Sequence, residues 1–287
     1  MQITVGCAQF APKKAHVEEN LDRVAAHILA AAGAGVRVVC FAEAIVSGYF
    51  LEGGVLDCAL EADELLEKLR KRLPAELDID VVLGFYESRG EVLFNSAAYL
   101  EFLPGSARVV HVYQKFFLPT YGVFDEERFV SSGNEVGAFD TRFGKSAMLI
   151  CEDVWHSIMP TICAVQGTQI LYVPSASPAR GFKGDRPANM ERWEKLLSSI
   201  CEEHSIYCLN SMLVGFEGGK GFGGGSSITG PDGALLASSP IFEESLLVTQ
   251  IDLEHLRTER ARSPLLGDLR SRWSQLINQA QRAIPPE

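Results

Sequence analysis

Short apolar runs alternate with helical patterns along most of this chain, and no other feature of the sequence restricts its fold as strongly. Residues 36–42 (VRVVCFA) form the clearest run, which is typical of a strand buried on both faces. Similar strand patterns occupy residues 3–7, 81–87, 94–102, 107–112, 146–150, 170–174, 206–216, 228–237 and 246–251, and helical patterns occupy residues 17–32, 61–72 and 187–204. This alternation predicts an α/β fold.

Turn signals indicate that some of these strands form hairpins. Arg89-Gly90, Pro104-Gly105 and Pro231-Asp232-Gly233 are the clearest of them. Hairpins join antiparallel strands and crossover helices join parallel ones, so we expect a mixed sheet rather than a purely parallel one. No linker or repeat divides the chain, which favours one domain.

Two stretches have no regular period. Residues 116–137 are long for a connection in a compact domain, and such stretches are usually functional. Residues 215–225 are rich in glycine but lack the G-x-x-x-x-G-K-[ST] order of a phosphate-binding loop. We interpret them as a flexible loop near the mouth of a site.

Charge and cysteine usage exclude several classes of protein. A net charge of −11 argues against a nucleic-acid partner. No apolar run approaches the roughly 20 residues that span a bilayer, and the first residues lack the features of a signal peptide. Seven scattered cysteines without a C-x-x-C pair suit free thiols in a reducing cytoplasm. We therefore expect a cytoplasmic protein with no membrane contact, no metal and no cofactor.

Cys151 is the first candidate for chemistry. It follows the apolar run AMLI and precedes Glu152-Asp153-Val154-Trp155, with a helix expected to start near Trp155. A thiol between a strand end and a helix N-terminus faces a cleft, and the helix dipole favours its thiolate. The alternative is a buried cysteine of the core.

Glu43 and Lys115 occupy equivalent positions at the ends of other predicted strands. Burial of Glu43 would raise its pKa and make it a usable base, whereas the alternative is a carboxylate that caps backbone or pairs with an arginine. Lys115 could supply positive charge to an oxyanion, or it could be a solvated lysine. All three candidates lie at the carboxyl end of a strand, where α/β proteins place their sites.

The segments around these residues carry a family resemblance. FAEAIVSGYF contains Glu43, VYQKFFLP contains Lys115 and LICEDVW contains Cys151. In this order they resemble the nitrilase (carbon–nitrogen hydrolase) superfamily, along nearly the whole chain. The resemblance implies a Glu–Lys–Cys triad and a four-layer α-β-β-α sandwich. It also implies a hydrolase domain over residues 1–262 and a tail over 263–287 at the interface of a homodimer or higher homo-oligomer.

One branch of the superfamily is especially similar. Residues 118–129 (LPTYGVFDEERF), the C-E-D-x-W at the nucleophile and Ser177-Pro178 resemble the glutamine-hydrolysing domain of glutamine-dependent NAD synthetases. True nitrilases usually read C-W-E at the nucleophile, so nitriles are less expected as substrates. The S-G-G-x-D-S type loop of the synthetase domain does not occur in the sequence, so we expect no NAD synthesis from these residues.

The resemblance implies a cysteine-dependent hydrolase that cleaves a small linear amide to a carboxylic acid and ammonia. A thioester would form on Cys151, Glu43 would transfer protons, and Lys115 with the backbone N–H of Glu152 would hold the oxyanion. The alternatives are a glutaminase subunit that supplies a separate partner, an N-carbamoyl amide hydrolase, an acyltransferase and a non-catalytic binding protein.

The resemblance also implies supporting residues around the triad. A second glutamate after the lysine corresponds to Glu126, with the adjacent Glu127 as the other possibility. Tyr49, Tyr121 and Ser177 are candidates for the pocket, although an aromatic residue beside a glycine is more often packed in a loop.

Overall fold

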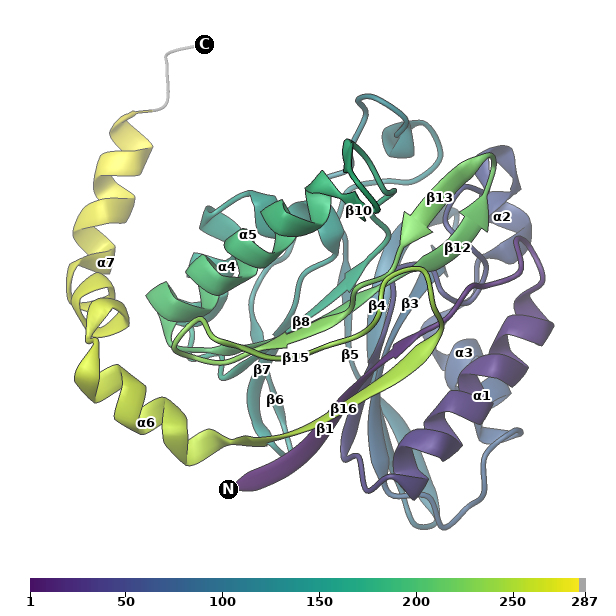
Figure 1. The fold of residues 1–287 in the computed structure, drawn as a ribbon, viewed down its shortest axis with the longest axis horizontal. Helices are drawn as coiled ribbons and strands as arrows, with labels where there is room; N and C mark the ends of the chain where they lie inside the picture. Colours follow the sequence, from purple (N-terminus) through teal and green to yellow (C-terminus); the bar gives the residue numbers. More distant parts are fainter. Residues whose placement is uncertain (284–287) are drawn as a thin grey trace.

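Two β-sheets pack face to face, and helices cover the outer face of each sheet (Figure 1). The computed structural model describes residues 1–283. Helices α1 (Val17–Gly33) and α3 (Ala62–Arg70) lie against the first sheet, and α4 (Ile158–Val165) and α5 (Ala188–His204) cover the second. The predicted α-β-β-α sandwich is confirmed.

The first sheet has six strands in the order β16-β1-β2-β3-β4-β5. Its strands are β1 (Gln2–Gln9), β2 (Val38–Phe41), β3 (Ile79–Arg89), β4 (Val92–Leu103), β5 (Ser106–Gln114) and β16 (Ser245–Asp252). Strands β1, β2 and β3 run parallel, whereas β16, β4 and β5 pair antiparallel with their neighbours. The sheet is therefore mixed, as the sequence predicted. Short helices η1 (Glu52–Gly54) and α2 (Val55–Cys58) follow β2.

The second sheet also has six strands, in the order β15-β14-β11-β8-β7-β6. They are β6 (Ala138–Thr141), β7 (Gly144–Met148), β8 (Ile170–Ser175), β11 (Tyr207–Met212), β14 (Ser227–Thr229) and β15 (Leu235–Ser238). Strands β7, β8 and β11 are parallel, and β14 with β15 forms the predicted hairpin. The sequence analysis missed β6, a short and only partly buried strand.

Two predictions fail in the segment after β11. Residues 206–216 are not one strand, because β11 is followed by a separate strand, β12 (Val214–Glu217), which leaves the sheet. The glycine-rich residues are not a flexible loop either. Strand β12 pairs with β13 (Lys220–Gly223) around Gly218 and Gly219, both of which have a positive φ that suits glycine. A second small hairpin joins β9 (Phe182–Lys183) to β10 (Arg186–Pro187).

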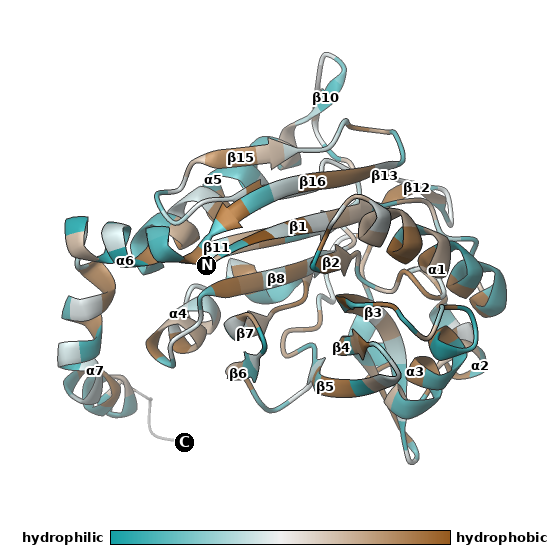
Figure 2. Ribbon diagram, turned by 90° about the horizontal axis from the view of Figure 1, so that it is seen from below, coloured by the Kyte–Doolittle hydropathy of each residue, from teal (hydrophilic) through white to brown (hydrophobic). Residues whose placement is uncertain are grey.

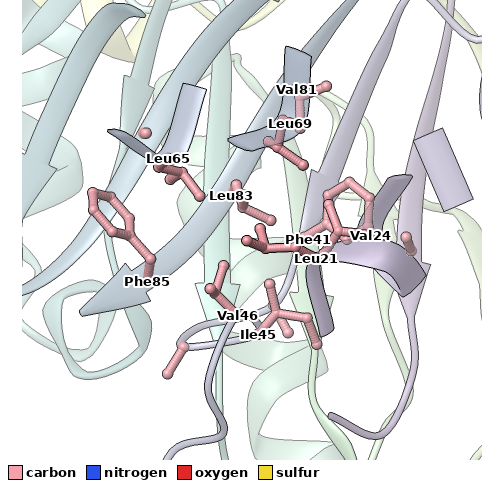
Figure 3. Packing of buried hydrophobic residues seen from close by; sticks show 14 of the residues in the cluster. Leu21, Val24, Phe41, Ile45, Val46, Leu65, Leu69, Val81, Leu83 and Phe85 are labelled. Atoms are coloured by element: carbon pink, nitrogen blue, oxygen red, sulfur yellow. The ribbon is translucent and has the colours of Figure 1, made fainter. Parts of the chain in front are cut away.

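Apolar side chains fill the spaces between layers. On α1, the buried residues Leu21, Val24 and Ile28 recur every three or four residues and belong to the core of the first sheet. Figure 3 shows Leu21 and Val24 beside Phe41. A second core fills the space between the two sheets and extends under α5. All seven cysteines are buried and unpaired, as the sequence predicted.

Two helices end the chain. α6 (Leu253–Arg262) follows β16, and α7 (Leu265–Arg282) contacts α4 and α5 at the edge of the molecule (Figure 2). Leu266 is the single buried residue of α7, whereas Leu265 and Leu276 are exposed. The predicted tail over 263–287 thus consists mainly of α7, and its last four residues lie outside the described ones. Within residues 1–283, no helix has the length and apolar character needed to cross a bilayer.

Candidate active site

Glu43 lies two residues beyond the end of β2 and is fully buried. The adjacent strand β3 contributes Gly84 at this point. A Cβ on Gly84 would lie 2.4 Å from the carbonyl oxygen of Ala42 and 2.7 Å from Cα of Glu43. Because no side chain fits in that space, the glycine allows the chain carrying Glu43 to pass directly beside β3.

Three donors surround the Glu43 carboxylate. Oε1 accepts hydrogen bonds from Nζ of Lys115 at 2.6 Å and Nδ2 of Asn95 at 2.8 Å, and Oε2 accepts from the backbone N–H of Ala176 at 2.7 Å. Burial raises the pKa of Glu43 to about 7, although Lys115 opposes the shift. A carboxyl group with this pKa can accept and return a proton near neutral pH.

Lys115 directly follows the last residue of β5. Its backbone N–H donates to the carbonyl of Asn95 at 2.8 Å, and its carbonyl accepts from the N–H of Gly133 at 2.8 Å. A Cβ on Gly133 would lie 2.3 Å from the carbonyl oxygen of Gln114, so glycine is required for this approach. The backbone of Lys115 is therefore held on both sides.

The Lys115 ammonium group lies between two carboxylates. Nζ is 2.6 Å from Oε1 of Glu43 and 2.7 Å from Oε1 of Glu126, and the side chain is fully buried. Burial disfavours its charge, but Glu126 and Glu43 outweigh burial and hold the pKa of Lys115 well above its usual value. Lys115 is thus a buried cation, and the alternative of a solvated lysine is wrong.

Glu126 begins the short helix η2 (Glu126–Arg128) inside the long segment 116–137. It is buried, whereas Glu127 is exposed. Oε1 of Glu126 also accepts a hydrogen bond from the hydroxyl of Tyr49. Of the two glutamates that the sequence left open, only Glu126 contacts Lys115.

Asn95 was missed by the sequence analysis. It is buried on β4, and its Nδ2 donates to Oε1 of Glu43 at 2.8 Å and to Oε2 of Glu126 at 3.4 Å. The amide thus joins the two carboxylates that flank Lys115. A single amide in the apolar stretch FNSAAYL was the signal, because a buried polar side chain requires partners.

Cys151 begins the five-residue 3-10 helix η3 (Cys151–Trp155), three residues after β7. Its φ is 47°, in the left-handed region that costs a residue with a side chain on the order of 1–3 kcal/mol. Backbone strain of this kind is concentrated at functional sites. The regular helix α4 begins at Ile158, later than the predicted start near Trp155.

The predicted stabilisation of a Cys151 thiolate is wrong. Burial raises the pKa of Cys151 well above its usual value, and the charge of Glu43 adds to the shift. Lys115 and the backbone N–H of Ala176 act in the opposite direction but do not overcome burial. The thiol is therefore neutral at physiological pH and needs a base.

A cavity of about 470 Å³ opens beside Cys151. Two of the three predicted pocket residues, Tyr121 and Ser177, line it together with Glu152. The hydroxyl of Tyr121 donates to both carboxylate oxygens of Glu152 at 2.9 and 2.8 Å. Tyr49 lies elsewhere, behind Glu126, where it lines a separate cavity of about 190 Å³.

The cavity wall also contains two cations that the sequence analysis missed. Arg180 lies over the ring of Phe124 at 5.5 Å, and Arg192 of α5 lies over the ring of Trp155 at 5.2 Å. Among residues 1–283, no carboxylate forms an ion pair with either guanidinium group. Nor does this part of the chain contain a cluster of His, Cys, Asp or Glu placed to hold a metal.

Residues 4–261 match the carbon-nitrogen hydrolase family. This chain belongs to that family. The matched region includes Glu43, Lys115 and Cys151 and extends from β1 into α6. The resemblance drawn from the three sequence segments is therefore confirmed.

The curated relatives include the glutamine-dependent NAD(+) synthetase of Acinetobacter baylyi, which is 29% identical over 257 residues. The aligned region covers 89% of this chain and 45% of that protein. The chain thus spans about half the length of this relative, as expected from a likeness to one domain of such enzymes.

Solved structures match over nearly the whole chain. The carbon-nitrogen hydrolase from Helicobacter pylori G27 has a TM-score of 0.83 at 23% identity, covering 93% of this chain and 94% of that one. An amidase from Nesterenkonia sp. has a TM-score of 0.75 at 24% identity, covering 91% and 94%. These likenesses establish the fold.

Proposed function

We propose that this protein hydrolyses a small linear amide to a carboxylic acid and ammonia, through a thioester on Cys151. The observation that carries the proposal is a buried ion cluster, in which Lys115 pairs with Glu43 and Glu126. Its charges influence the pKa of Cys151, which lines an open cavity. A neutral thiol, a carboxyl group with a pKa near 7 and a fixed cation are the components of acyl transfer to sulfur.

The first half of the reaction transfers the acyl group to sulfur. The Glu43 carboxylate accepts the proton of the Cys151 thiol while Sγ attacks the amide carbonyl carbon. The carbonyl oxygen becomes an oxyanion, which Lys115 and the backbone N–H of Glu152 stabilise. Glu43 then returns the proton to the amide nitrogen, the C–N bond breaks, and ammonia leaves the thioester.

The second half regenerates the enzyme. Glu43, again ionised, accepts a proton from water as the water oxygen attacks the thioester carbonyl. The C–S bond breaks, the acid departs, and the proton returns to Sγ of Cys151. Lys115 remains protonated throughout because its pKa is held well above the usual value.

We further propose that the amide carries a carboxylate, or a carboxylate and an ammonium group. Arg180 and Arg192 are the cations of the cavity wall, and the Glu152 carboxylate supplies an anion to the same cavity. A guanidinium group binds a carboxylate through paired hydrogen bonds. Glutamine and the ω-amides of dicarboxylic acids meet these requirements.

The relatives support the amide class from two directions. The NAD(+) synthetase of Acinetobacter baylyi is described as glutamine-dependent. The Nesterenkonia protein is described as an amidase, and a mutant of it is described with acrylamide added to its active-site cysteine. Both descriptions concern those proteins, and here they favour an amide over a nitrile as the substrate.

A second candidate function is a glutaminase that supplies ammonia to a separate protein. The specific observation in its favour is that 89% of this chain aligns with a glutamine-dependent relative. The same triad would act, but the rate would depend on the partner. Co-purification of an ammonia-consuming protein with a rise in glutamine hydrolysis would support this candidate.

We also propose that α7, within the tail 263–287, forms a homodimer interface beside the hydrolase domain of residues 1–262. α7 contacts α4, α5 and α6 but leaves apolar side chains such as Leu265 and Leu276 exposed. An exposed apolar helix face of this kind is typical of a protein–protein contact.

Ammonia release from a panel of amides tests the proposed function. The panel contains glutamine, short aliphatic amides, ω-amides of dicarboxylic acids and N-carbamoyl amines. The wild type should release ammonia from at least one of them, and Cys151→Ala should release none. Cys58→Ala, which removes a cysteine far along the chain on α2, is the matched control and should keep full activity. Equal release by Cys151→Ala would contradict the assignment of the nucleophile.

A further inference from the structure

Asp153 is a buried carboxylate that the proposed chemistry does not use. It lies in η3, two residues after Cys151, and is fully inaccessible to solvent. Among residues 1–283 it forms no ion pair, although Lys115 is close enough to influence its pKa. A buried carboxylate is costly unless donors surround it, so its partners show what it holds in place.

Four donors converge on Asp153. Oδ1 accepts from the backbone N–H groups of Phe116 at 3.2 Å and Phe117 at 2.8 Å. Oδ2 accepts from the backbone N–H of Ile150 at 3.0 Å and from the hydroxyl of Tyr113 at 2.8 Å. Each oxygen therefore has both of its lone pairs occupied.

These donors belong to the two segments that carry the catalytic candidates. Tyr113, Phe116 and Phe117 flank Lys115, and Ile150 immediately precedes Cys151. The backbone N–H of Asp153 also donates to the carbonyl of Ile150 at 3.0 Å, which closes the turn around Cys151. One side chain thus connects the strained turn of the nucleophile to the segment of the lysine.

We propose that Asp153 is a positioning residue that holds the turn at Cys151 in a fixed place relative to Lys115. This role rests on the proposed function of those two residues. Asp153 does not line the cavity beside Cys151, so it acts through the backbone and does not touch the substrate. The fixed positive φ of Cys151 persists because hydrogen bonds on both sides of the turn determine it.

An uncharged isostere should disturb this arrangement in a defined way. In Asp153→Asn, one oxygen still accepts from Phe116 and Phe117, but the amide nitrogen faces the N–H of Ile150. The amide N–H of the new asparagine and the backbone N–H of Ile150 are then two donors facing each other. Their repulsion should shift the turn that carries Cys151. Small displacements of a reacting group cost about 10²-fold in rate, so kcat should fall by this order with little change in KM.

Alkylation of Cys151 by iodoacetamide measures this position without reference to any substrate. The wild type and Asp153→Asn are compared at fixed pH by the rate at which mass spectrometry detects the modified cysteine. Asp153→Asn should alkylate at least about tenfold more slowly while it keeps a cooperative unfolding transition. Equal alkylation rates and equal kcat in a folded variant would overturn the proposal.

Two tyrosines provide a milder test if Asp153→Asn does not fold. The hydroxyl of Tyr113 donates to Asp153 at 2.8 Å, and the hydroxyl of Tyr99 donates to the buried Asp80 at 2.7 Å, away from Cys151. Tyr113→Phe and Tyr99→Phe therefore remove equivalent hydrogen bonds. We expect a similar loss of stability in both, and a several-fold loss of kcat and alkylation rate in Tyr113→Phe alone. Equal rates in the two variants would overturn the proposal.

The two proposals fail in different ways. If the wild type releases no ammonia from any amide, the proposed function fails, but the alkylation rates still report on Asp153. If the wild type is active and Asp153→Asn reacts like it, the positioning role fails and the hydrolase remains.

Discussion

Behind Cys151 lies a charged cluster, formed by Glu43, Asn95, Lys115 and Glu126, in which every residue is buried and each contacts another through a hydrogen bond. In front of it lies a cavity wall, where Arg180 and Arg192 are exposed and Tyr121 is 53% exposed. The first arrangement is fixed by the fold, since Glu43 and Lys115 follow strand ends, Asn95 lies on β4, and hydrogen bonds join Glu126 to Lys115 and Asn95. The second is built from loop and helix side chains that solvent reaches.

This difference assigns separate roles to the two regions. Buried charges interact strongly and keep their geometry, which suits the transfer of protons and the stabilisation of an oxyanion. Exposed side chains contribute less to stability, and substitutions among them change binding without loss of the fold. We therefore expect changes in the charged cluster to affect kcat and changes in the cavity wall to affect KM.

Lys115→Met should produce the largest effect. Removing the cation leaves the Glu43 and Glu126 carboxylates buried together without a partner, which destabilises a protein by about 3–5 kcal/mol. Loss of the oxyanion partner should also reduce kcat by about 10³-fold or more. Denaturant unfolding and ammonia release measure the two effects, and a fully active variant would refute the role of the cluster.

Glu126→Gln should reduce kcat by about 10²-fold, because it loosens the Lys115 ammonium group. The charge of Glu126 raises the pKa of Glu43. Removal of that charge should therefore lower the pKa of Glu43 and shift the acid limb of the pH–rate profile to lower pH than in the wild type. Glu127→Gln, which changes an exposed neighbour, is the control and should leave the profile unchanged. A profile that moves to higher pH in Glu126→Gln would contradict the assignment.

The wild-type pH dependence should reflect Glu43. The base acts when ionised, and its pKa is raised to about 7, so kcat/KM should rise as pH increases through about 7. Below that pH the rate should fall about tenfold per unit. No loss is expected up to pH 9, because the pKa values of Cys151 and Lys115 lie well above their usual range. A flat profile between pH 5 and 9 would exclude Glu43 as the base.

Arg192→Ala should weaken substrate binding and leave the chemical steps unchanged. If the guanidinium group binds a carboxylate, KM for a carboxylate-bearing amide should rise about tenfold or more, with kcat little changed. A neutral aliphatic amide serves as the control substrate and should show no such rise. Equal changes for both substrates would argue against carboxylate recognition, and Arg180→Ala tests the other cation in the same way.

Leu276→Glu should have the smallest effect on activity. Leu276 is 46% exposed on α7, far along the chain from the catalytic candidates, and a charge there should weaken a dimer. Analytical ultracentrifugation at micromolar concentration should show a dimer for the wild type and a monomer for the variant. A monomeric wild type would contradict the proposed interface.

The charged cluster was the more predictable of the two regions. Glu43, Lys115 and Cys151 each follow an apolar strand pattern within three residues. The end of that pattern therefore predicts the position of the catalytic candidate. Asn95 was missed because it lies within a strand, where a single amide among apolar residues indicates a buried partner but not whether that partner is catalytic. The direction of the Cys151 pKa was also missed, because burial depends on contacts between distant segments.

The cavity wall was less predictable for a physical reason. Arg180 and Arg192 lie in a loop and on a helix, where an arginine is usually a solvated charge and no periodic pattern marks it. Tyr121 and Ser177, which the family resemblance predicted for the pocket, line the cavity together with Glu152. Tyr49 was predicted for the pocket or its support, and the fold places it against Glu126 instead of the cavity beside Cys151.

Trapping of the acyl enzyme tests the central claim most directly. The wild type is mixed with an amide that it hydrolyses, quenched in acid within the first turnover, digested and analysed by mass spectrometry. The account predicts the acyl mass on the peptide that contains Cys151, and its disappearance after hydroxylamine treatment, which cleaves thioesters. Rapid ammonia release with every cysteine unmodified during turnover would contradict the thioester mechanism.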